Sequence, residues 1–368
     1  MPTIVRNLAA LPLILCCGGD TSPRGQGGEA PQNIPILDEY SVQVTGLLGR
    51  TFFTHPGLGF PGSLAVAGRA LVVADELGDT PLFVVDRATR AIISRLGRRG
   101  DGPGEFRTVW SLTTSRDRPS EVWAFDAGLL RLTPIRLSDA GGDTASVQAE
   151  RSFQLTPKVQ VLQVASLGSG RFIAHALLPD GQFLVFDTTG RVLEKLGPPP
   201  PEIEGVPAVV RAQAYRGAFT LKPDASRMAL ALRHGGQATI FDSSGQPVQV
   251  VQTPFRFSPK FGVKDTRAGP WLTLGADTRM GYLAIASSTN FLFALFSGRT
   301  IAGFPRREYY GDYVHVFTWD GKLHAVLKLQ AEAVDIAVDE TGTVLYASAT
   351  DPEPSVYEYF LDAALRKN

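Results

Sequence analysis

Hydrophobic residues along most of the chain fall in short runs that end at Asp or Gly. Past residue 35 these runs are rich in Val, Ile, Leu and Phe, and turn residues separate them. The clearest set consists of Ala70–Asp75, Leu82–Asp86 and Ala91–Gly97, and a second copy consists of Arg171–Leu178, Gln182–Asp187 and Arg191–Gly197. This pattern predicts β-strands joined by tight turns. Only Val206–Tyr215 has the spacing of an amphipathic helix.

The strand pattern repeats with a regular period. The Asp residues that end the third strand of each copy lie 53, 48, 55, 78 and 42 residues apart: Asp86, Asp139, Asp187, Asp242, Asp320 and Asp362. A period of about 50 residues predicts an all-β fold, a six-bladed β-propeller with four antiparallel strands per blade. The 78-residue interval predicts an insertion, either at Phe255–Pro270 or at Ile301–Gly311.

The last copy stops one strand short, and the other end of the chain can supply the missing strand. This copy contains Asp335–Val338, Thr343–Ser348 and Val356–Leu361. Near the start, Tyr40–Leu47 precedes a glycine-rich segment like the one that follows the fourth strand of the first copy. We therefore expect Tyr40–Leu47 to be the fourth strand of blade six, paired with Val356–Leu361. Such pairing closes the ring and covers an open sheet edge.

The first residues predict export from the cytoplasm. Arg6 is followed by the apolar run Leu8–Leu15, which is far shorter than the roughly 20 residues of a membrane-spanning helix but suits a secretory signal. Cys16 and Cys17 come next, and the segment resembles a bacterial lipoprotein signal, in which a cysteine is lipidated and becomes the mature N-terminus. The resemblance implies lipidation of Cys17 or Cys16. The alternative is an ordinary signal cut near Gly18 or Gly19.

These segments define the expected domain organisation. We assign residues 1–16 to a signal peptide, 17–35 to a flexible tether, 36–363 to the propeller and 364–368 to a C-terminal tail. The chain has two cysteines, and both lie in the leader, so the propeller can have neither a disulfide framework nor a cysteine-ligated metal. We expect the only membrane contact to be the lipid anchor of a cell-envelope protein.

Composition and charge exclude two broad classes. The 36 Lys and Arg residues balance 36 Asp and Glu, and 44% of the residues are hydrophobic, which is enough for a large core. The chain is therefore neither a disordered protein nor one that binds nucleic acid through bulk positive charge. Its 38 Gly and 26 Pro residues suit a turn-rich, all-β chain.

Three further segments resemble a known family. Gly97–Phe106 lies between a fourth strand and the next first strand, and resembles the glycine-rich linker of NHL-type six-bladed propellers. Leu295–Arg299 and Phe317–Lys322 are similar to segments of TolB-like six-bladed propeller lipoproteins of the BF3164 type. The resemblance runs from about Ile36 to Leu361. Members of this group mostly have no assigned function, so the resemblance implies a fold and no ligand.

Several motifs that could carry chemistry have a structural explanation. The glycines of Gly100–Gly104 lack the following helix and the Lys-Ser/Thr pair of a phosphate-binding loop. The Asp residues of the next motifs begin hairpin turns, in which Asp binds its own backbone and Gly adopts a left-handed conformation: Asp187–Gly190, Asp242–Gly245, Asp320–Gly321 and Asp339–Gly342. The apolar segment Tyr282–Gly298 is interrupted by Ser287–Asn290, which favours two strands over a membrane span.

The sequence shows no metal site, catalytic residue or cofactor motif. A calcium site rich in Asn, as in lactonase propellers, needs several Asn residues, whereas the predicted propeller contains only Asn290. His175 and His234 end or follow second strands of adjacent blades and could meet at the axis, but form no short metal motif. There is no Gly-x-Ser-x-Gly motif of a serine hydrolase.

We expect a binding scaffold that presents rigid loops to an envelope protein or a small ligand. Aromatic residues with arginine are favoured in binding surfaces. The candidate contacts are Arg299, Tyr309, Tyr310 and Tyr313. The alternatives are a hydrolase or lyase with a metal in the axial tunnel, and a periplasmic sensor of small molecules. Three or more Asp, Glu or His side chains converging on the axis within metal-bonding distance would favour the enzyme, whereas a tunnel lined by Ser, Ala, Val and Arg would favour binding.

Overall fold

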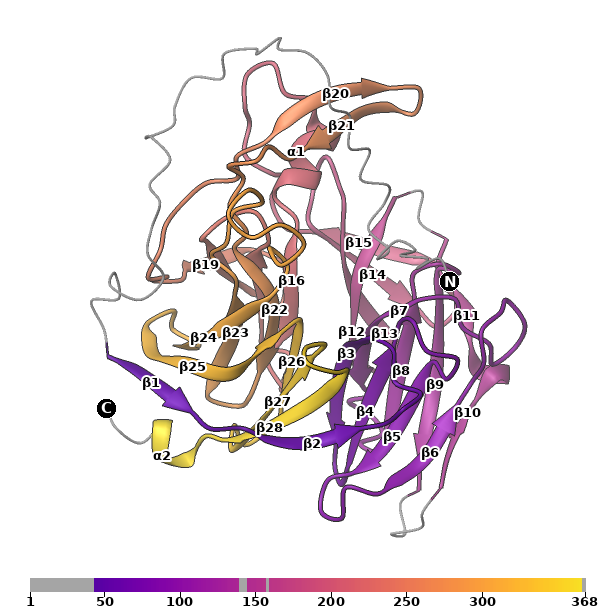
Figure 1. Ribbon diagram of the computed structural model, residues 1–368. Helices are drawn as coiled ribbons and strands as arrows, with labels where there is room; N and C mark the ends of the chain where they lie inside the picture. Colours follow the sequence, from indigo (N-terminus) through magenta and orange to yellow (C-terminus); the bar gives the residue numbers. More distant parts are fainter. Residues whose placement is uncertain (1–42, 139–143, 157–158, 366–368) are drawn as a thin grey trace, which may run out of the picture. The chain divides into compact units, whose positions relative to one another are not determined.

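The computed structural model describes residues 43–138, 144–156 and 159–365. All of them belong to one compact unit, Ile36–Asn368. The described strands form six sheets of four or more strands, arranged as blades around a ring (Figure 1), which confirms the predicted six-bladed propeller.

Each blade runs from an inner strand near the middle of the ring to an outer strand at its edge. The inner strands are β3 (Pro61–Ala67), β7 (Val109–Thr114), β12 (Val161–Gly168), β16 (Gly217–Leu221), β22 (Tyr282–Ser287) and β26 (Asp335–Val338). The second strands are β4 (Ala70–Asp75), β8 (Glu121–Asp126), β13 (Arg171–Ala176), β17 (Arg227–Leu232), β23 (Phe291–Phe296) and β27 (Val344–Ala349).

The third and fourth strands complete the blades. The third strands are β5 (Leu82–Asp86), β9 (Arg131–Leu137), β14 (Phe183–Asp187), β18 (Ala238–Asp242), β24 (Gly311–Thr318) and β28 (Ser355–Phe360). The outer strands of blades one to five are β6 (Ile92–Leu96), β10 (Ala145–Val147), β15 (Val192–Leu196), β19 (Pro247–Val250) and β25 (Leu323–Ala333). In blade two, the 3₁₀ helix η1 (Ala149–Arg151) leads to β11 (Phe153–Gln154), which also pairs with β9.

The hydrophobic core lies between neighbouring blades. One cluster joins Val84 of blade one to Ile135 of blade two, and another joins Trp123 of blade two to Phe172 of blade three. Because each sheet packs on both faces, every residue of β4 and β5 is buried. This double burial explains why the sequence shows continuous apolar runs instead of strict alternation.

The N-terminal segment closes the ring, but the closing strand is not Tyr40–Leu47. β2 (Arg50–Thr54) pairs antiparallel with β28 and is the fourth strand of blade six. β1 (Val44–Leu47) pairs parallel with β25 and adds a fifth strand to blade five, while residues 40–42 lie outside the described residues. The prediction missed β2 because this strand has only two buried residues, Phe52 and Phe53, and no alternating pattern.

The long interval before Asp320 contains two long connections. A hairpin of β20 (Gly262–Thr266) and β21 (Gly269–Thr273) separates blades four and five, and a loop over residues 297–310 separates β23 from β24. Between blades three and four, the predicted helix is α1 (Ala208–Ala214). Tyr282–Gly298 forms two strands, as predicted. Among the described residues, no helix has the length and apolarity to cross a membrane.

The Asp residues of the predicted turns serve the turns themselves. The Asp187 carboxylate accepts hydrogen bonds from the backbone N–H groups of Thr189, at 2.9 Å, and Arg191, at 3.1 Å. Asp242 binds Ser244 and Gln246 in the same way. The turn glycines have positive φ angles, for example +76° at Gly190. Asp139 lies outside the described residues.

The C-terminal end of the described chain packs against the ring. α2 (Asp362–Leu365) follows β28, and Ala364 and Leu365 contact the core between blades five and six. His324 lies 3.1 Å from the Leu365 carbonyl oxygen through its Nε2 atom. Part of the predicted tail therefore belongs to the packed body.

Candidate functional site

Side chains of the inner strands link neighbouring blades around the axis. The hydroxyl of Ser63 in blade one accepts a hydrogen bond from the N–H of Leu112 in blade two, at 3.2 Å. Ser111 and Gln163 repeat this link toward blades three and four, at 3.2 and 2.7 Å. These bonds satisfy backbone donors that the sheets leave unpaired at the blade junctions.

Asp335 takes the same position at the junction between blades six and one. Its Oδ2 atom accepts a hydrogen bond from the N–H of Leu64 at 3.0 Å. Three other junctions use the uncharged acceptors Ser63, Ser111 and Gln163, so a carboxylate is not needed for this link. Burial raises the pKa of Asp335 to about 7, although backbone N–H groups and Arg233 act in the opposite direction. A charged group here costs stability, which marks Asp335 as a functional candidate.

The strand directions bring four charged residues to one rim of the ring. In an antiparallel blade, the start of the inner strand and the end of the second strand lie at the same rim. Asp335 begins β26 and Arg216 directly precedes β16, whereas Glu76 directly follows β4 and Arg233 follows β17. None of the four residues is fully buried, although desolvation is the largest cause of the pKa shift of each.

These residues converge on the axis. Arg233 belongs to blade four and Glu76 to blade one, which are opposite blades in a ring of six. Arg233 nevertheless affects the pKa values of both Glu76 and Asp335, so its side chain extends toward the middle of the ring. Tyr309, from the loop after β23, affects both Arg216 and Arg233. We call Glu76, Arg216, Arg233, Tyr309 and Asp335 the axial cluster.

The two arginines of the axial cluster are direct cross-strand neighbours. The N–H of Arg233 donates to the carbonyl oxygen of Arg216 at 3.0 Å, next to the pair Gly217–Leu232 of the β16–β17 ladder. Burial and repulsion from Arg233 lower the pKa of Arg216 to about 10, and burial lowers the pKa of Arg233. The Nε of Arg216 is buried and has no hydrogen-bond partner among the described residues.

The acidic side of the cluster contains a second carboxyl group in a confined place. Burial raises the pKa of Glu76 to about 7; Asp75 adds to this shift, and Arg99 and Arg233 oppose it. The Glu76 side chain lies against Gly62 of the inner strand β3, where a Cβ atom would come within 2.3 Å of Glu76 Oε1. Gly62 therefore leaves the room that Glu76 occupies.

The structure gives the four predicted contact residues different surroundings. Tyr313 is fully buried, with Lys328 over its ring at 4.1 Å, and so does not belong to an exposed loop. Arg299 is 5% exposed and binds Glu332 at 2.5 Å. Tyr310 accepts a hydrogen bond from Thr350 at 3.0 Å. Tyr309 alone among them lies at the axial cluster, and a binding role for the four remains a prediction.

His175 and His234 were candidates to meet at the axis, but both ring nitrogens of His175 are occupied by structural contacts. His175 Nδ1 lies 3.0 Å from the Gln182 carbonyl oxygen, and its Nε2 accepts the N–H of Gly217 at 3.2 Å. Burial lowers the pKa of His175 to about 4, and burial with the nearby Arg216 and Arg233 lowers that of His234. Within the described ranges, no group of three His, Cys, Asp or Glu side chains could hold a metal ion.

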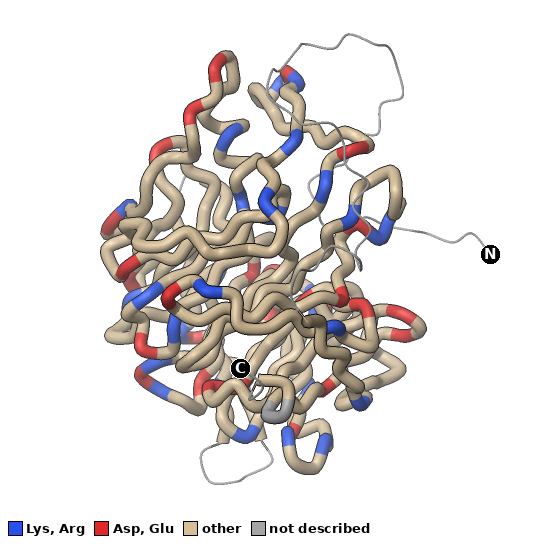
Figure 2. The backbone as a smooth tube through the Cα atoms, turned by 90° about the vertical axis from the view of Figure 1, so that its left-hand side faces the viewer, with Lys and Arg blue, Asp and Glu red and all other residues tan. Residues whose placement is uncertain are grey.

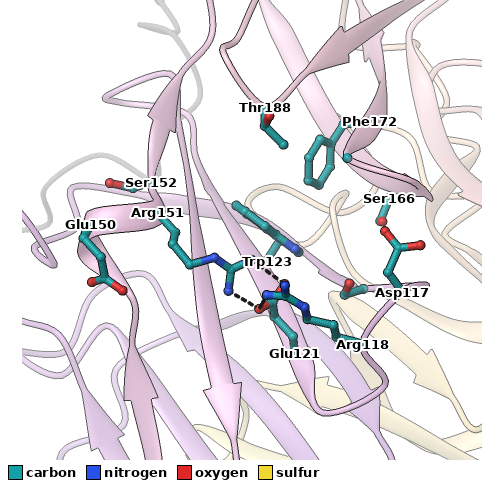
Figure 3. A pocket seen from close by; sticks show the side chains of 12 residues that line it. Asp117, Arg118, Glu121, Trp123, Glu150, Arg151, Ser152, Ser166, Phe172 and Thr188 are labelled. Carbon is teal, nitrogen blue, oxygen red and sulfur yellow. Dashed lines mark hydrogen bonds and ion pairs between the residues drawn. The ribbon is translucent and has the colours of Figure 1, made fainter.

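A groove of about 500 Å³ lies between blades two and three, at the opposite rim (Figure 3). Its buried charge is Glu121, which is 3% exposed and pairs with Arg118 at 3.4 Å and with Arg151. The Arg151 guanidinium also lies over the Trp123 ring at 5.5 Å. Because Glu121 is already paired, this groove is better explained as a joint between two blades than as a site that awaits a charged ligand.

Charge elsewhere on the surface is mixed. Figure 2 shows Lys and Arg interspersed with Asp and Glu over the side in view. No region of one sign stands out there, in line with equal numbers of acidic and basic residues in the sequence.

The sequence contains a signal for the axial cluster that is not one of the familiar catalytic or binding motifs. Glu76 and Arg233 each come directly after a second strand, at equivalent positions of blades one and four. The equivalent residues of the other blades are uncharged: Ala127, Leu177, Ser297 and Thr350. Aligning the six copies at the ends of their second strands identifies this position, because only two of the copies carry a charged residue there.

Several solved structures resemble this chain at low sequence identity. The structure of U3-55K and the crystal structure of RRP9 WD40 repeats each share 12% identity and a TM-score of 0.52, cover 85% of this chain, and are themselves covered to 98% and 97%. The Myceliophteria thermophila Cps50 (Swd1) propeller domain also shares 12% identity, with 84% and 99% coverage and a TM-score of 0.48. At this identity the likeness concerns the fold alone. No curated protein matches the sequence significantly.

A family profile matches most of the chain. The match covers residues 38–341 and carries the description TolB-like 6-blade propeller-like. It spans blades one to five and the start of blade six, in agreement with the six blades of the structure. The chain therefore belongs to the TolB-like six-bladed propeller family.

Proposed function

We propose that this protein is a ligand-binding propeller of the cell envelope, and that the axial cluster binds an anionic group. The observation that carries the proposal is the arginine pair. No ion pair joins Arg216 or Arg233 to a carboxylate in the part of the chain that the structure describes. Glu76 and Asp335 favour the charged form of Arg233 from beyond ion-pair distance. The two adjacent guanidinium groups still repel each other, and an anion bound between them reduces this repulsion.

The chemistry of the pair suits a carboxylate or a phosphate group. Guanidinium presents planar, paired donors that match the two oxygens of such groups. The Nη2 of Arg233 donates a hydrogen bond to the carbonyl oxygen of Leu283 at 3.2 Å, and this bond fixes the Arg233 side chain. Tyr309, close to both arginines, can limit the size of the bound group from the loop side.

The proposal is tested by calorimetric titration of the purified chain with inorganic phosphate and with acetate. We expect at least one anion to bind, and Arg216→Met or Arg233→Met to weaken binding ten-fold or more. Arg267→Met, in the exposed turn of the β20–β21 hairpin, is the matched control and should bind as the native chain does. If neither anion binds, or if all three variants bind alike, the axial cluster is not an anion site.

We propose that the protein is exported and held by a lipid on Cys17 or Cys16, through a tether that ends near residue 35. Its support is the apolar run and the cysteines of the leader. Both cysteines lie outside the described residues. Mass spectrometry of the mature N-terminus tests this part, because a diacylglyceryl mass on either cysteine is expected. An unmodified N-terminus beyond Cys17 would contradict it.

The axial cluster suits a binding site better than it suits a metal-dependent hydrolase or lyase. The axial cluster contains two carboxyl groups, fewer than the three acidic or His ligands set out for an enzyme, and its two arginines favour an anionic ligand over a metal ion. The small ligand is preferred over an envelope protein as partner, because the unpaired charges lie near the axis and not on the outer face. The BF3164 subtype and the NHL-type linker remain predictions.

A further inference from the structure

We propose that the axial cluster recognises a zwitterion, an amino acid or a short peptide, whose carboxylate binds Arg216 and Arg233 and whose ammonium group binds Glu76 and Asp335. This inference rests on the proposed anion site and adds the second half of the ligand. Its basis is that the cluster is divided into a basic side and an acidic side, contributed by different blades.

The basic side comes from blade four alone. Arg216 and Arg233 are opposed residues at the end of one β-ladder, so their side chains leave the same face of the sheet. The buried Nε of Arg216 lacks a partner among the described residues, which leaves at least one donor for a ligand.

The acidic side comes from blades one and six, which are adjacent across the closure of the ring. Glu76 lies against Gly62 and Asp335 accepts the N–H of Leu64, so both carboxyl groups contact the same strand, β3, at positions two residues apart. Glu76 also raises the pKa of Asp335, and Arg233 lowers the pKa of both. Asp335 accepts the N–H of Leu64 through Oδ2 at 3.0 Å, and the backbone N–H of Ile336 also favours its charged form. Glu76 is confined by its contact with Gly62. An ammonium group is a compact cation with three donors, which suits two carboxyl groups that converge.

Charge balance favours a zwitterion over a simple anion. The two arginines and the two carboxylates together have no net formal charge. A simple anion would pair with the arginines but leave the carboxylates facing each other, whereas a simple cation would leave the arginines unpaired. A zwitterion gives each of the four groups an oppositely charged partner. This matters because an unpaired charge in a largely buried site is costly.

The test uses glycine, diglycine, triglycine and tetraglycine, each beside its N-acetyl form and its methyl ester. The N-acetyl forms keep the carboxylate and lose the cation, and the esters do the reverse. Titration of the full chain by calorimetry should show at least one glycine peptide that binds ten-fold or more tightly than both of its derivatives. The length of the best binder then reports the separation of the basic and acidic sides. If no glycine peptide binds more tightly than its own N-acetyl and methyl ester forms, the zwitterion inference is wrong.

Variants separate this inference from the proposed function. Glu76→Gln with Asp335→Asn should remove the preference for the free ammonium group, so that the N-acetyl form binds as tightly as its parent. Circular dichroism confirms that the double variant is folded, and the single Glu76→Gln variant replaces it if it is not. If the native chain already binds the N-acetyl forms as tightly and Arg216→Met abolishes this binding, the inference fails and the anion site stands. If phosphate or acetate binds but no glycine compound does, the inference alone fails. If none of these compounds binds, both fail.

Discussion

The backbone N–H of Arg233 donates to the carbonyl oxygen of Arg216 at 3.0 Å, and so holds two positive side chains opposite each other on one β-ladder. Like charges at directly opposed positions destabilise a sheet. Their persistence near the axis of the ring is best explained by the anion that they would bind.

This relationship predicts a conflict between stability and binding. Arg216→Met keeps most of the side-chain volume and removes one of the two charges, so we expect the free energy of unfolding to rise by about 1 kcal/mol. Binding of the anion should weaken in the same variant. Chemical denaturation measures the first effect, and Arg267→Met, at an exposed position, should change neither quantity. A loss of stability in Arg216→Met would show that the arginine pair is structural.

Asp335 predicts a specific pH dependence. Its folded-state pKa of about 7 lies above the ordinary value of 3.8, so the folded state binds more protons than the unfolded state between these pH values. The free energy of unfolding must therefore fall as pH rises from about 4 to 7. Asp335→Asn keeps an acceptor for Leu64 and removes this loss, so the variant should gain about 2 kcal/mol over the native chain at pH 8.

The comparison at two pH values supplies the control for Asp335. At about pH 4 the native carboxyl is mostly protonated, and the two chains should differ by much less than at pH 8. Buried His175, with a pKa lowered to about 4, acts in the opposite direction over the acid range, but it is present in both chains and cancels in their difference. A difference that does not change with pH would contradict the raised pKa of Asp335.

The links between inner strands predict a measurable cost when one is removed. Ser63→Ala leaves the N–H of Leu112 without its acceptor at the junction of blades one and two. We expect a loss of about 1 kcal/mol in the free energy of unfolding, since an unsatisfied buried donor is costly. Ser243→Ala, at an exposed turn position, is the matched control and should change stability by less than about 0.5 kcal/mol.

The closing strand β2 predicts that the N-terminal segment contributes strongly to stability. Phe52 is 3% exposed and contacts Tyr346 edge-on, with ring centroids 4.9 Å apart, in the core between blades six and one. Phe52→Ala should lower the free energy of unfolding by about 3–5 kcal/mol, because it leaves a cavity at the point where the ring closes. Leu48→Ala, four residues earlier and 88% exposed, should have almost no effect. Equal effects of the two substitutions would disprove closure by β2.

Gly62 offers a test of the acidic side that leaves every charged residue unchanged. In Gly62→Ala the new Cβ would lie 2.3 Å from Glu76 Oε1, so the end of the Glu76 side chain must move. A flexible side chain moves at little cost, and we expect stability to fall by about 1 kcal/mol or less. Binding of the glycine peptides should weaken while binding of their N-acetyl forms does not. Unchanged binding of both would place Glu76 outside the site.

The sequence by itself determined the repeat, and with it the fold. Apolar runs that end at Asp187 or Asp242, followed by a turn glycine, are local patterns that adjacent residues specify, so the number of blades and the turn roles of these residues could be predicted. The helix at Ala208–Ala214 and the hairpin that begins at Tyr282 were recognised for the same reason.

Only the tertiary structure decided which distant residues meet. Glu76 and Arg233 are far apart in sequence and have no motif in common, and they approach each other only because opposite blades face the same axis. The choice of β2 over β1 as the closing strand likewise depends on a partner, β28, at the other end of the chain. The periodicity of the sequence indicates which way a residue faces within its own strand. Contacts across the axis form only when the ring closes, and every blade contributes to that closure.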